Sequence, residues 1–290
     1  MKRLLCSVLS IAVVATAGLT LLNAGSKNAN ELLSPSKANF LGVSQQNPIK
    51  LSKAFCMHMS GKYAGGTETR NFEVLVENLA YDKKISVVHK KDDGSWTELP
   101  MSYKQSVANN KELWQLHYSK STIPWDSSPS NIPSLGDEFA IKYSVNGQDF
   151  WDNNNGKNYT ITNNDGPFIQ EGLDIDVNEA NSYFGSYDNK IRLMLDVRNI
   201  SSTKDVKVHY STDDWNSVQV SNAQYQGYIT TGYSCESIYT PNKFGIEVWR
   251  FENLITNTQS KTFKYVVSYN LNGNEIIDNN FGSGYEIKIN

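Results

Sequence analysis

The sequence is poor in residues that form disulfides or bind metals. Only 3 cysteines and 4 histidines occur in 290 residues. Cys6 lies in an N-terminal apolar run, and Cys56 and Cys235 fall in different halves of the chain, so no disulfide framework can stabilise either half. A single bridge between the halves is permitted in a secreted protein but is not indicated by the sequence. No cysteine or histidine spacing fits a metal site, and we predict a protein without metal or cofactor.

The chain also lacks a strong charge of either sign and, beyond its first residues, any long apolar run. The formal net charge of -3 does not favour a polyanionic partner such as nucleic acid. The apolar run at 4–22 follows two basic residues and ends in small residues, which is typical of a secretory signal over residues 1–25. An uncleaved membrane anchor is the alternative, but serine, threonine and glycine interrupt the run. We therefore expect a secreted, extracellular protein with no membrane attachment after signal cleavage.

Helical periodicity is nearly absent, with one weak candidate around residues 175–183. Apolar residues instead alternate with polar ones over short segments, as at Phe72, Val74 and Val76. The same alternation recurs in three further segments, at residues 85–89, 114–118 and 139–143. This pattern predicts an all-β chain. The acidic stretch at 174–179 lacks the central glycine and closing glutamate of a calcium loop, so we interpret it as a solvated turn or the entry to a strand.

One pattern occurs twice in the chain. Residues 143–159 (YSVNGQDFWDNNNGKNY) align without gaps with residues 269–285 (YNLNGNEIIDNNFGSGY), and the segments around Trp96 and Trp215 also correspond. A cluster of turn formers at 163–167 separates the copies. We therefore predict five parts: a signal peptide at 1–25, a flexible leader at 26–49, module one at 50–163, a linker at 164–170 and module two at 171–290.

The end of module one combines aromatic residues with a polar turn. Phe150 and Trp151 precede an asparagine-rich run at 152–159. Because neighbouring residues in a strand face opposite sides, one of these two rings should face solvent. Trp96 follows an Asp-Asp-Gly loop and offers another aromatic platform. Flat aromatic surfaces beside amides and carboxylates suit the apolar faces and hydroxyl rims of sugars, although periodicity alone fits a core or rim tryptophan equally well.

From residue 72 to residue 161, module one resembles carbohydrate-binding module family 21, which comprises starch- and glycogen-binding modules. The resemblance rests on residues 76–84 (VENLAYDKK), on Trp96, and on residues 138–143 (EFAIKY) together with the run at 151–159. It implies an immunoglobulin-like antiparallel β-sandwich for each module, in agreement with the strand pattern. It also implies binding of an α-1,4-glucan polysaccharide such as starch or glycogen, or of a maltooligosaccharide.

The resemblance also implies where sugars bind. Trp96 and Trp151 match two aromatic residues of the family's main site, and Ala140 stands where a third would be expected. The polar partners at that site are Asn153, Asn158 and the adjacent Asp152. A second site is implied around the Asn-Leu-Ala-Tyr motif, built from Tyr81, Lys83, Asn78 and Tyr103.

Module two departs further from the family pattern. The positions of Tyr81 and Trp151 hold Ser202 and Ile277, so the candidate sugar contacts of this module are Trp215 and Asn279. An aromatic-rich insertion carries four tyrosines, Tyr225, Tyr228, Tyr233 and Tyr239. These side chains form a different sugar surface or cover the module's own core, and the frequency of tyrosine at sandwich edges favours the second interpretation.

Catalysis is not predicted. The acidic pairs at 92–93 and 213–214 lie in turn sequences, which do not indicate a cleft with two catalytic carboxylates, and no G-x-S-x-G elbow occurs. We predict non-catalytic binding of α-glucan, mainly through module one, with a secreted amylolytic enzyme as a further partner. Two alternatives stay open: an extracellular structural or adhesive β-sandwich protein whose sugar sites have decayed and, with less support, an enzyme.

Overall fold

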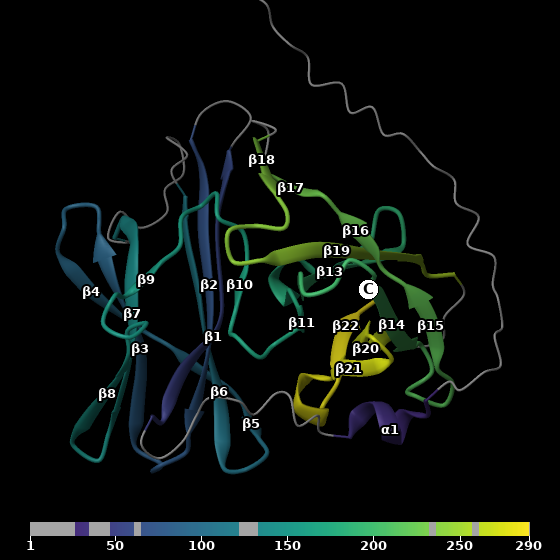
Figure 1. Ribbon diagram of the computed structural model, residues 1–290, viewed down its shortest axis with the longest axis horizontal. Coiled ribbons are helices and arrows are strands. Elements are labelled where there is room, and N and C mark those ends of the chain that lie inside the picture. The colour runs from purple at the N-terminus through teal and green to yellow at the C-terminus, as the bar shows by residue number, and fades with distance from the viewer. Residues whose placement is uncertain are drawn as a thin grey trace, which may run out of the picture.

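The computed structural model contains two antiparallel β-sandwiches in tandem (Figure 1). It describes residues 27–34, 47–60, 65–121, 133–231, 236–256 and 261–289. The predicted signal peptide and Cys235 lie outside these residues. Within them, no helix is both long enough and apolar enough to span a membrane. The predicted all-β fold class is confirmed, because the only helical elements described are a five-residue α-helix and short 3-10 turns.

Module one is built from two sheets that face each other. The first sheet has the order β10-β1-β2-β6-β5, formed by β1 (Ile49–Ser60), β2 (Gly66–Glu77), β5 (Ser102–Val107), β6 (Lys111–Ser121) and β10 (Phe168–Ile169). The second has the order β4-β3-β7-β8 with β9 also on β7, formed by β3 (Lys83–Lys91), β4 (Trp96–Pro100), β7 (Leu135–Val145), β8 (Gln148–Asp152) and β9 (Tyr159–Thr160).

Module two repeats this arrangement. Its first sheet has the order β11-β13-β19-β16 with β12 also on β13, formed by β11 (Ile175–Val177), β12 (Tyr183–Gly185), β13 (Lys190–Arg198), β16 (Gln224–Gln226) and β19 (Ile246–Leu254). Its second has the order β15-β14-β20-β21 with β22 also on β20, formed by β14 (Asp205–Ser211), β15 (Gln219–Asn222), β20 (Thr262–Leu271), β21 (Asn274–Asp278) and β22 (Tyr285–Lys288). The two 3-10 turns are η2 (Glu179–Asn181) and η3 (Asn280–Gly282).

The core of each module follows the predicted alternation. In β2 and β7 the alternate residues Phe72, Val74, Phe139 and Ile141 are buried between the two sheets, while their sequence neighbours face outward. Burial of one such side chain contributes about 1.5–3 kcal/mol. The weak helical candidate at 175–183 is wrong, since that segment forms β11, the turn η2 and the start of β12.

Two further segments join the modules more closely than the sequence indicates. The predicted linker contains β10, whose residues pair with Lys53 and Ala54 of β1, so it belongs to the first sheet of module one. The inserted hairpin of β17 (Tyr228–Thr231) and β18 (Glu236–Tyr239) packs Ile229 and Ile238 against Phe55 of β1. The second sandwich therefore rests on the outer face of the first one's β1 (Figure 1).

The leader is not a free tail over its described part. Residues 27–34 form helix α1 (Ala29–Leu33), which begins at an Asn28 capping box and lies beside module two (Figure 1). Leu32 is fully buried, although a five-residue helix has little stability of its own. The prediction of a flexible leader is thus wrong for this part, because contacts with module two hold it in place.

Acid is expected to destabilise module one through His89. This ring is fully buried between the sheets, where it stacks on Phe139, and Nε2 lies 3.4 Å from the Arg70 guanidinium. Burial, with Arg70 adding to it, lowers the His89 pKa to about 4. Because folding lowers the pKa of this base, the unfolded chain takes up the proton more readily than the folded module. The module therefore keeps its full stability above pH 6.5 and loses stability as the pH falls towards 4. The loss should reach about 3 kcal/mol, measured by urea unfolding at pH 7 and at pH 4.

A His89→Gln variant provides the test of this assignment. It removes the titrating group while keeping a polar side chain, so the acid-dependent loss for module one should largely disappear. The same substitution in module two, His209→Gln, serves for comparison with His89→Gln, because burial also lowers the pKa of the His209 ring. If His89→Gln loses as much stability in acid as wild type, the acid sensitivity comes from other groups.

Candidate functional site

The outer face of the β4-β3-β7-β8 sheet carries both predicted tryptophan platforms. Trp96 begins β4, Trp151 lies in β8, and each is 45% exposed. Phe150 packs on the core beneath the same strand, so the alternation of these two neighbours places Trp151 in solvent as expected. In the strand register Trp96 lies opposite Lys90, and Trp151 lies opposite Lys142. Both lysines face outward, so the two indoles share one face of the sheet.

Register separates the two indoles along that face. Lys142 lies opposite Ser86 on β3, whereas Trp96 lies opposite Lys90, four residues further along the same strand. Three strand spacings and four residues of strand rise place Trp96 and Trp151 about 20 Å apart on an untwisted sheet. No single sugar ring can touch both side chains, so only an extended chain of sugars could contact them together.

Polar side chains stand next to each tryptophan. Beside Trp96, Glu138 accepts from Asn158 Nδ2 at 2.8 Å and pairs with Lys90 Nζ at 3.0 Å. The amide of Asn158, and then the ammonium of Lys90, hold the pKa of Glu138 below its usual value. Glu138 and Lys90, which were not predicted from the sequence, thus connect the predicted Asn158 with the strand position opposite Trp96.

The Trp151 end has its own ionic group. Lys142 Nζ lies 5.8 Å from the centre of the Trp151 ring and 3.3 Å from Asp149. A hydrogen bond from Ser144, followed by Lys142, lowers the pKa of Asp149. Lys142 and Glu138 could have been found from the sequence, because they alternate with buried residues of β7 and must point outward.

Between the two ends the strands β3 and β7 carry small side chains, and the exposed Glu98 of β4 lies opposite Val88 and 3.8 Å from Lys142. Ala140 pairs with Val88 in the middle of the sheet, and neither side chain is larger than a valine. Ala140 is the position at which the family resemblance leads one to expect a third aromatic residue. The face is therefore an open platform with a tryptophan at each end and charged or amide groups beside both.

The asparagine-rich turn shapes this edge. Asn153 Oδ1 accepts from Gly156 N at 2.9 Å, and the Asn153 carbonyl accepts from Asn158 N at 2.7 Å. Asn158 has a φ of 57°, a left-handed conformation that asparagine tolerates better than most residues. Asn153 thus uses its side-chain oxygen within the turn, while Asn158 points its amide at Glu138.

Asp152 is not a sugar contact. Its carboxylate is buried and accepts from Leu51 N at 2.8 Å and from Tyr159 Oη at 2.8 Å. Module two contains the same arrangement, in which Asp278 accepts from Val177 N at 3.0 Å and from the Tyr285 hydroxyl. We name this arrangement the aspartate clamp; it ties the second sheet of each module to the first.

Lys83 and Asn78 also have a structural role. The Lys83 ammonium bonds Asn78 Oδ1 and Glu112, and Glu112 in turn accepts from the Trp114 indole N–H at 3.0 Å. The Lys83 side chain is only 4% exposed, which leaves little surface for a sugar. Module two repeats every partner, with Lys204, Asn199, Glu247 and Trp249. Both predicted contacts are therefore corrected to members of a repeated ion-pair network.

The remaining candidates of the second predicted site are exposed. Tyr81 projects fully into solvent from the turn before β3. Tyr103 lies on the edge strand β5, where it meets Trp114 edge to face at 5.9 Å. The corresponding edge of module two places Tyr225 beside Trp249, also at 5.9 Å. An aromatic pair at a sheet edge is thus common to both modules.

One of the two predicted contacts in module two, Asn279, is occupied by the leader. The Asn279 side-chain amide is completely buried and donates to the carbonyls of Leu32 and Ser34, at 2.9 and 2.7 Å. Trp215 is half-buried, and its ring approaches Gly284 at the place where Leu33 also packs. The Asn279 amide is therefore used to anchor the leader and is not available to a sugar, whereas the assignment of Trp215 stays a prediction.

We name the outer face of the β4-β3-β7-β8 sheet, which carries Trp96 and Trp151, the tryptophan face. The leader also lies on the face of module two that corresponds to it. Lys27 pairs with Glu275 of β21 at 2.6 Å. On the outward side of the same sheet His209, Val266 and Ser268 are all buried, whereas an uncovered face would leave such positions partly open. The two modules thus share a scaffold, but this outer face is open in module one and covered in module two.

The tyrosines of the insertion are largely exposed. Tyr225, Tyr228 and Tyr239 are exposed, and Tyr233 lies outside the described residues. Ile229 and Ile238 form the buried side of the hairpin, and they pack towards module one. The covering interpretation is therefore wrong for Tyr228 and Tyr239, whereas Tyr225 lies against Trp249 at the edge of the module's core.

Comparison with known proteins places this scaffold in a family. The sequence model of the carbohydrate/starch-binding module (family 21) matches residues 43–162 and again residues 177–288. The chain belongs to this family. The match covers both modules of this family 21 protein, so the duplication is one of a whole carbohydrate-binding module.

Individual relatives match about one module. Protein phosphatase 1 regulatory subunit 3B of Rattus norvegicus is 36% identical over 92 residues, 31% of this chain and 30% of the relative. Glucoamylase 1 of Rhizopus oryzae is 30% identical over 95 residues, 31% of this chain and 14% of the enzyme. The chain thus spans less than a third of either relative.

A solved structure of the starch-binding domain of Rhizopus oryzae glucoamylase, in complex with β-cyclodextrin and maltoheptaose, is similar at 24% identity. The alignment covers 42% of this chain and 98% of that one, with a TM-score of 0.29.

Proposed function

We propose that this family 21 protein binds α-glucan of the starch or glycogen type through the tryptophan face of module one. The observation that carries the proposal is the pair of half-exposed indoles, Trp96 and Trp151, on one open sheet face. Their flat rings suit the apolar faces of glucose units, and the groups around Glu138 and Lys142 suit the hydroxyl rims. A chain of glucose units lying across the face would contact both tryptophans.

The proposed role is binding without catalysis, in a secreted protein. Family membership supports the sugar class, and the relatives of the chain include a glucoamylase and a regulatory subunit of protein phosphatase 1. The apolar run at 4–22 supports secretion, which favours an extracellular amylolytic enzyme as the functional partner. Module one is the main binding unit, because the leader occupies the equivalent face of module two.

A second candidate function is an extracellular structural or adhesive protein. The covered face of module two favours it, since one of the two family faces is used internally. The two candidates differ in a simple respect: the structural protein would not bind starch through the face of module one.

Co-sedimentation with insoluble starch tests the proposal. The full chain should pellet with starch and with glycogen-coated beads, should be released by maltoheptaose, and should stay in the supernatant with cellulose as a β-linked control. Reducing-sugar release from soluble starch should stay at the level of the blank. Protein that remains in the starch supernatant at all concentrations would leave the structural role as the better explanation.

A further inference from the structure

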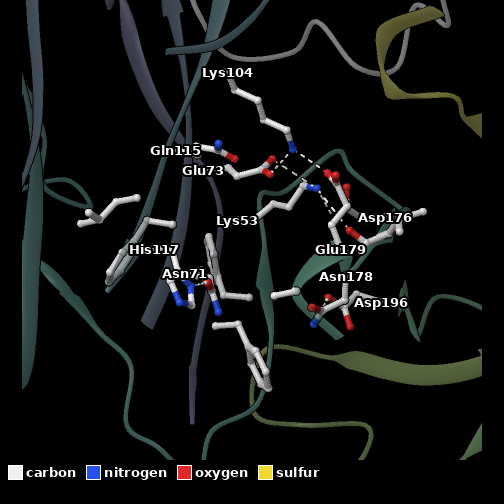
Figure 2. A pocket seen from close by; sticks show the side chains of 17 residues that line it. Lys53, Asn71, Glu73, Lys104, Gln115, His117, Asp176, Asn178, Glu179 and Asp196 are labelled. Carbon is white, nitrogen blue, oxygen red and sulfur yellow. Dashed lines mark hydrogen bonds and ion pairs between the residues drawn. The ribbon is translucent and has the colours of Figure 1, made fainter. Parts of the chain in front are cut away.

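A cavity of about 300 Å³ lies between the two modules (Figure 2). One wall is the outer face of β1, β2 and β6, and the other is formed by β11, η2 and β13. Phe55, Leu116 and Phe168 supply apolar surface, while most of the other lining side chains are polar or charged. The cavity is distant in the fold from the tryptophan face, which is on the opposite sheet of module one.

Charges in the cavity do not balance. Lys53 pairs with Glu73 at 3.2 Å and with Asp176 at 2.8 Å, and Lys104 bridges Glu73 and Glu179 (Figure 2). Asp196 adds a fourth carboxylate to the two ammonium groups of this lining. The lining therefore has two more carboxyl groups than ammonium groups, and two of the carboxyl groups, on Asp176 and Asp196, are buried, where charge is costly.

Asp196 is the carboxyl group of this lining that has no direct ion pair among the described residues. Its side chain is 4% exposed, and Oδ2 receives only a long bond of 3.4 Å from Asn178, while no partner of Oδ1 is found among the described residues. Asp196 also lies directly opposite Asp176 in the pairing of β11 with β13, and like charges in such a pair repel. Burial raises the pKa of Asp196 to about 7. The charge of Lys53 and the long bond from Asn178 act in the opposite direction but do not offset the burial, so Oδ1 has room for a further donor.

We propose that the cavity binds a small organic cation. Its ammonium group pairs with Asp196, and its apolar carbon skeleton lies against Phe168 and Leu116. An inorganic cation fits less well, because the described residues contain no group of three His, Cys, Asp or Glu side chains that could hold a metal ion. The volume admits a molecule the size of a single ring with one charged substituent.

Titration with a matched pair of probes tests the proposal. Cyclohexylammonium and cyclohexanol share a six-membered carbon ring and differ in charge, so each is added to the full chain while backbone amide NMR signals of β11 and β13 are followed. Cyclohexylammonium should give saturable shifts in these strands. Cyclohexanol should bind at least tenfold more weakly. Equal binding of the two probes, or no saturable shift with the cation, would overturn the proposal.

Two variants locate the charge. Asp196→Asn keeps the shape of the side chain and removes a buried charge, so the protein should fold and should bind cyclohexylammonium at least tenfold more weakly. Gln115→Arg places a fixed cation on an exposed residue of the lining and should weaken binding independently of any effect of Asp196 on folding. The control is Asp149→Asn on the tryptophan face, which should bind like wild type. Undiminished binding by both cavity variants would contradict the assignment.

Discussion

Replacement of both Trp96 and Trp151 by alanine is expected to abolish co-sedimentation with starch. Each indole is half-exposed and offers a large flat surface at low entropy cost, and truncation of such an anchor typically costs about 2 kcal/mol, or about 30-fold in affinity. The double variant should lose roughly 10²-fold or more. Binding isotherms with insoluble starch measure the change, and circular dichroism establishes that the variant still folds.

The single variants report how the sugar chain lies. If one glucan chain spans the separation of about 20 Å, each single replacement should weaken the same binding event. If the indoles bind separate chains, each replacement should halve the capacity for starch and leave the remaining affinity unchanged. Tyr187→Ala is the matched control, because Tyr187 is fully exposed in a turn of module two. A double variant that sediments like wild type would overturn the site and leave glucan binding to another surface.

Removal of one aspartate clamp should destabilise the module that contains it. Asp152→Ala leaves the Leu51 amide and the Tyr159 hydroxyl buried without their acceptor, and it deletes the bond between the two sheets. The expected loss is about 3–5 kcal/mol, a large share of the stability of a domain of this size. Differential scanning calorimetry should show a lowered transition for module one.

Asp278→Ala should give the corresponding loss in module two, where Val177 and Tyr285 lose the same acceptor. Asp149→Ala provides a control on the same strand as Asp152, because its carboxylate is half exposed and should change stability by less than about 0.5 kcal/mol. A clamp variant as stable as this control would show that water or a neighbouring group replaces the carboxylate.

Local pattern was sufficient to predict the sandwich and the outward tryptophan. Phe72, Val74 and Phe139 alternate with polar residues, and this period of two decides which side chains enter the core. The same rule separates Phe150 from Trp151. Repetition of the 143–159 segment predicted two modules of one type, and the paired clamps at Asp152 and Asp278 now give a physical reason for that repetition.

Long-range partners could not be read from the same pattern. Asn153 and Asn279 occupy equivalent positions in the repeat, but among the described residues it is Asn279 that meets the leader, which lies almost the whole chain away in sequence. Lys83 and Asn78 resemble surface sugar contacts until strand pairing brings Glu112 beside them. Asp176 and Asp196 stand on strands whose outward side looks solvated in the sequence, and only the docking of the modules buries them. In each case a distant segment decides the environment.

The position of the leader helix has a consequence for valency. A protein with two open sheet faces could bridge separate glucan chains and would precipitate a branched polymer, as a lectin does. Here the leader with α1 lies on one of the two faces, so the proposed glucan contacts of each protein molecule are confined to the open face of module one. We expect such a protein to coat a glucan surface and leave soluble glycogen dispersed.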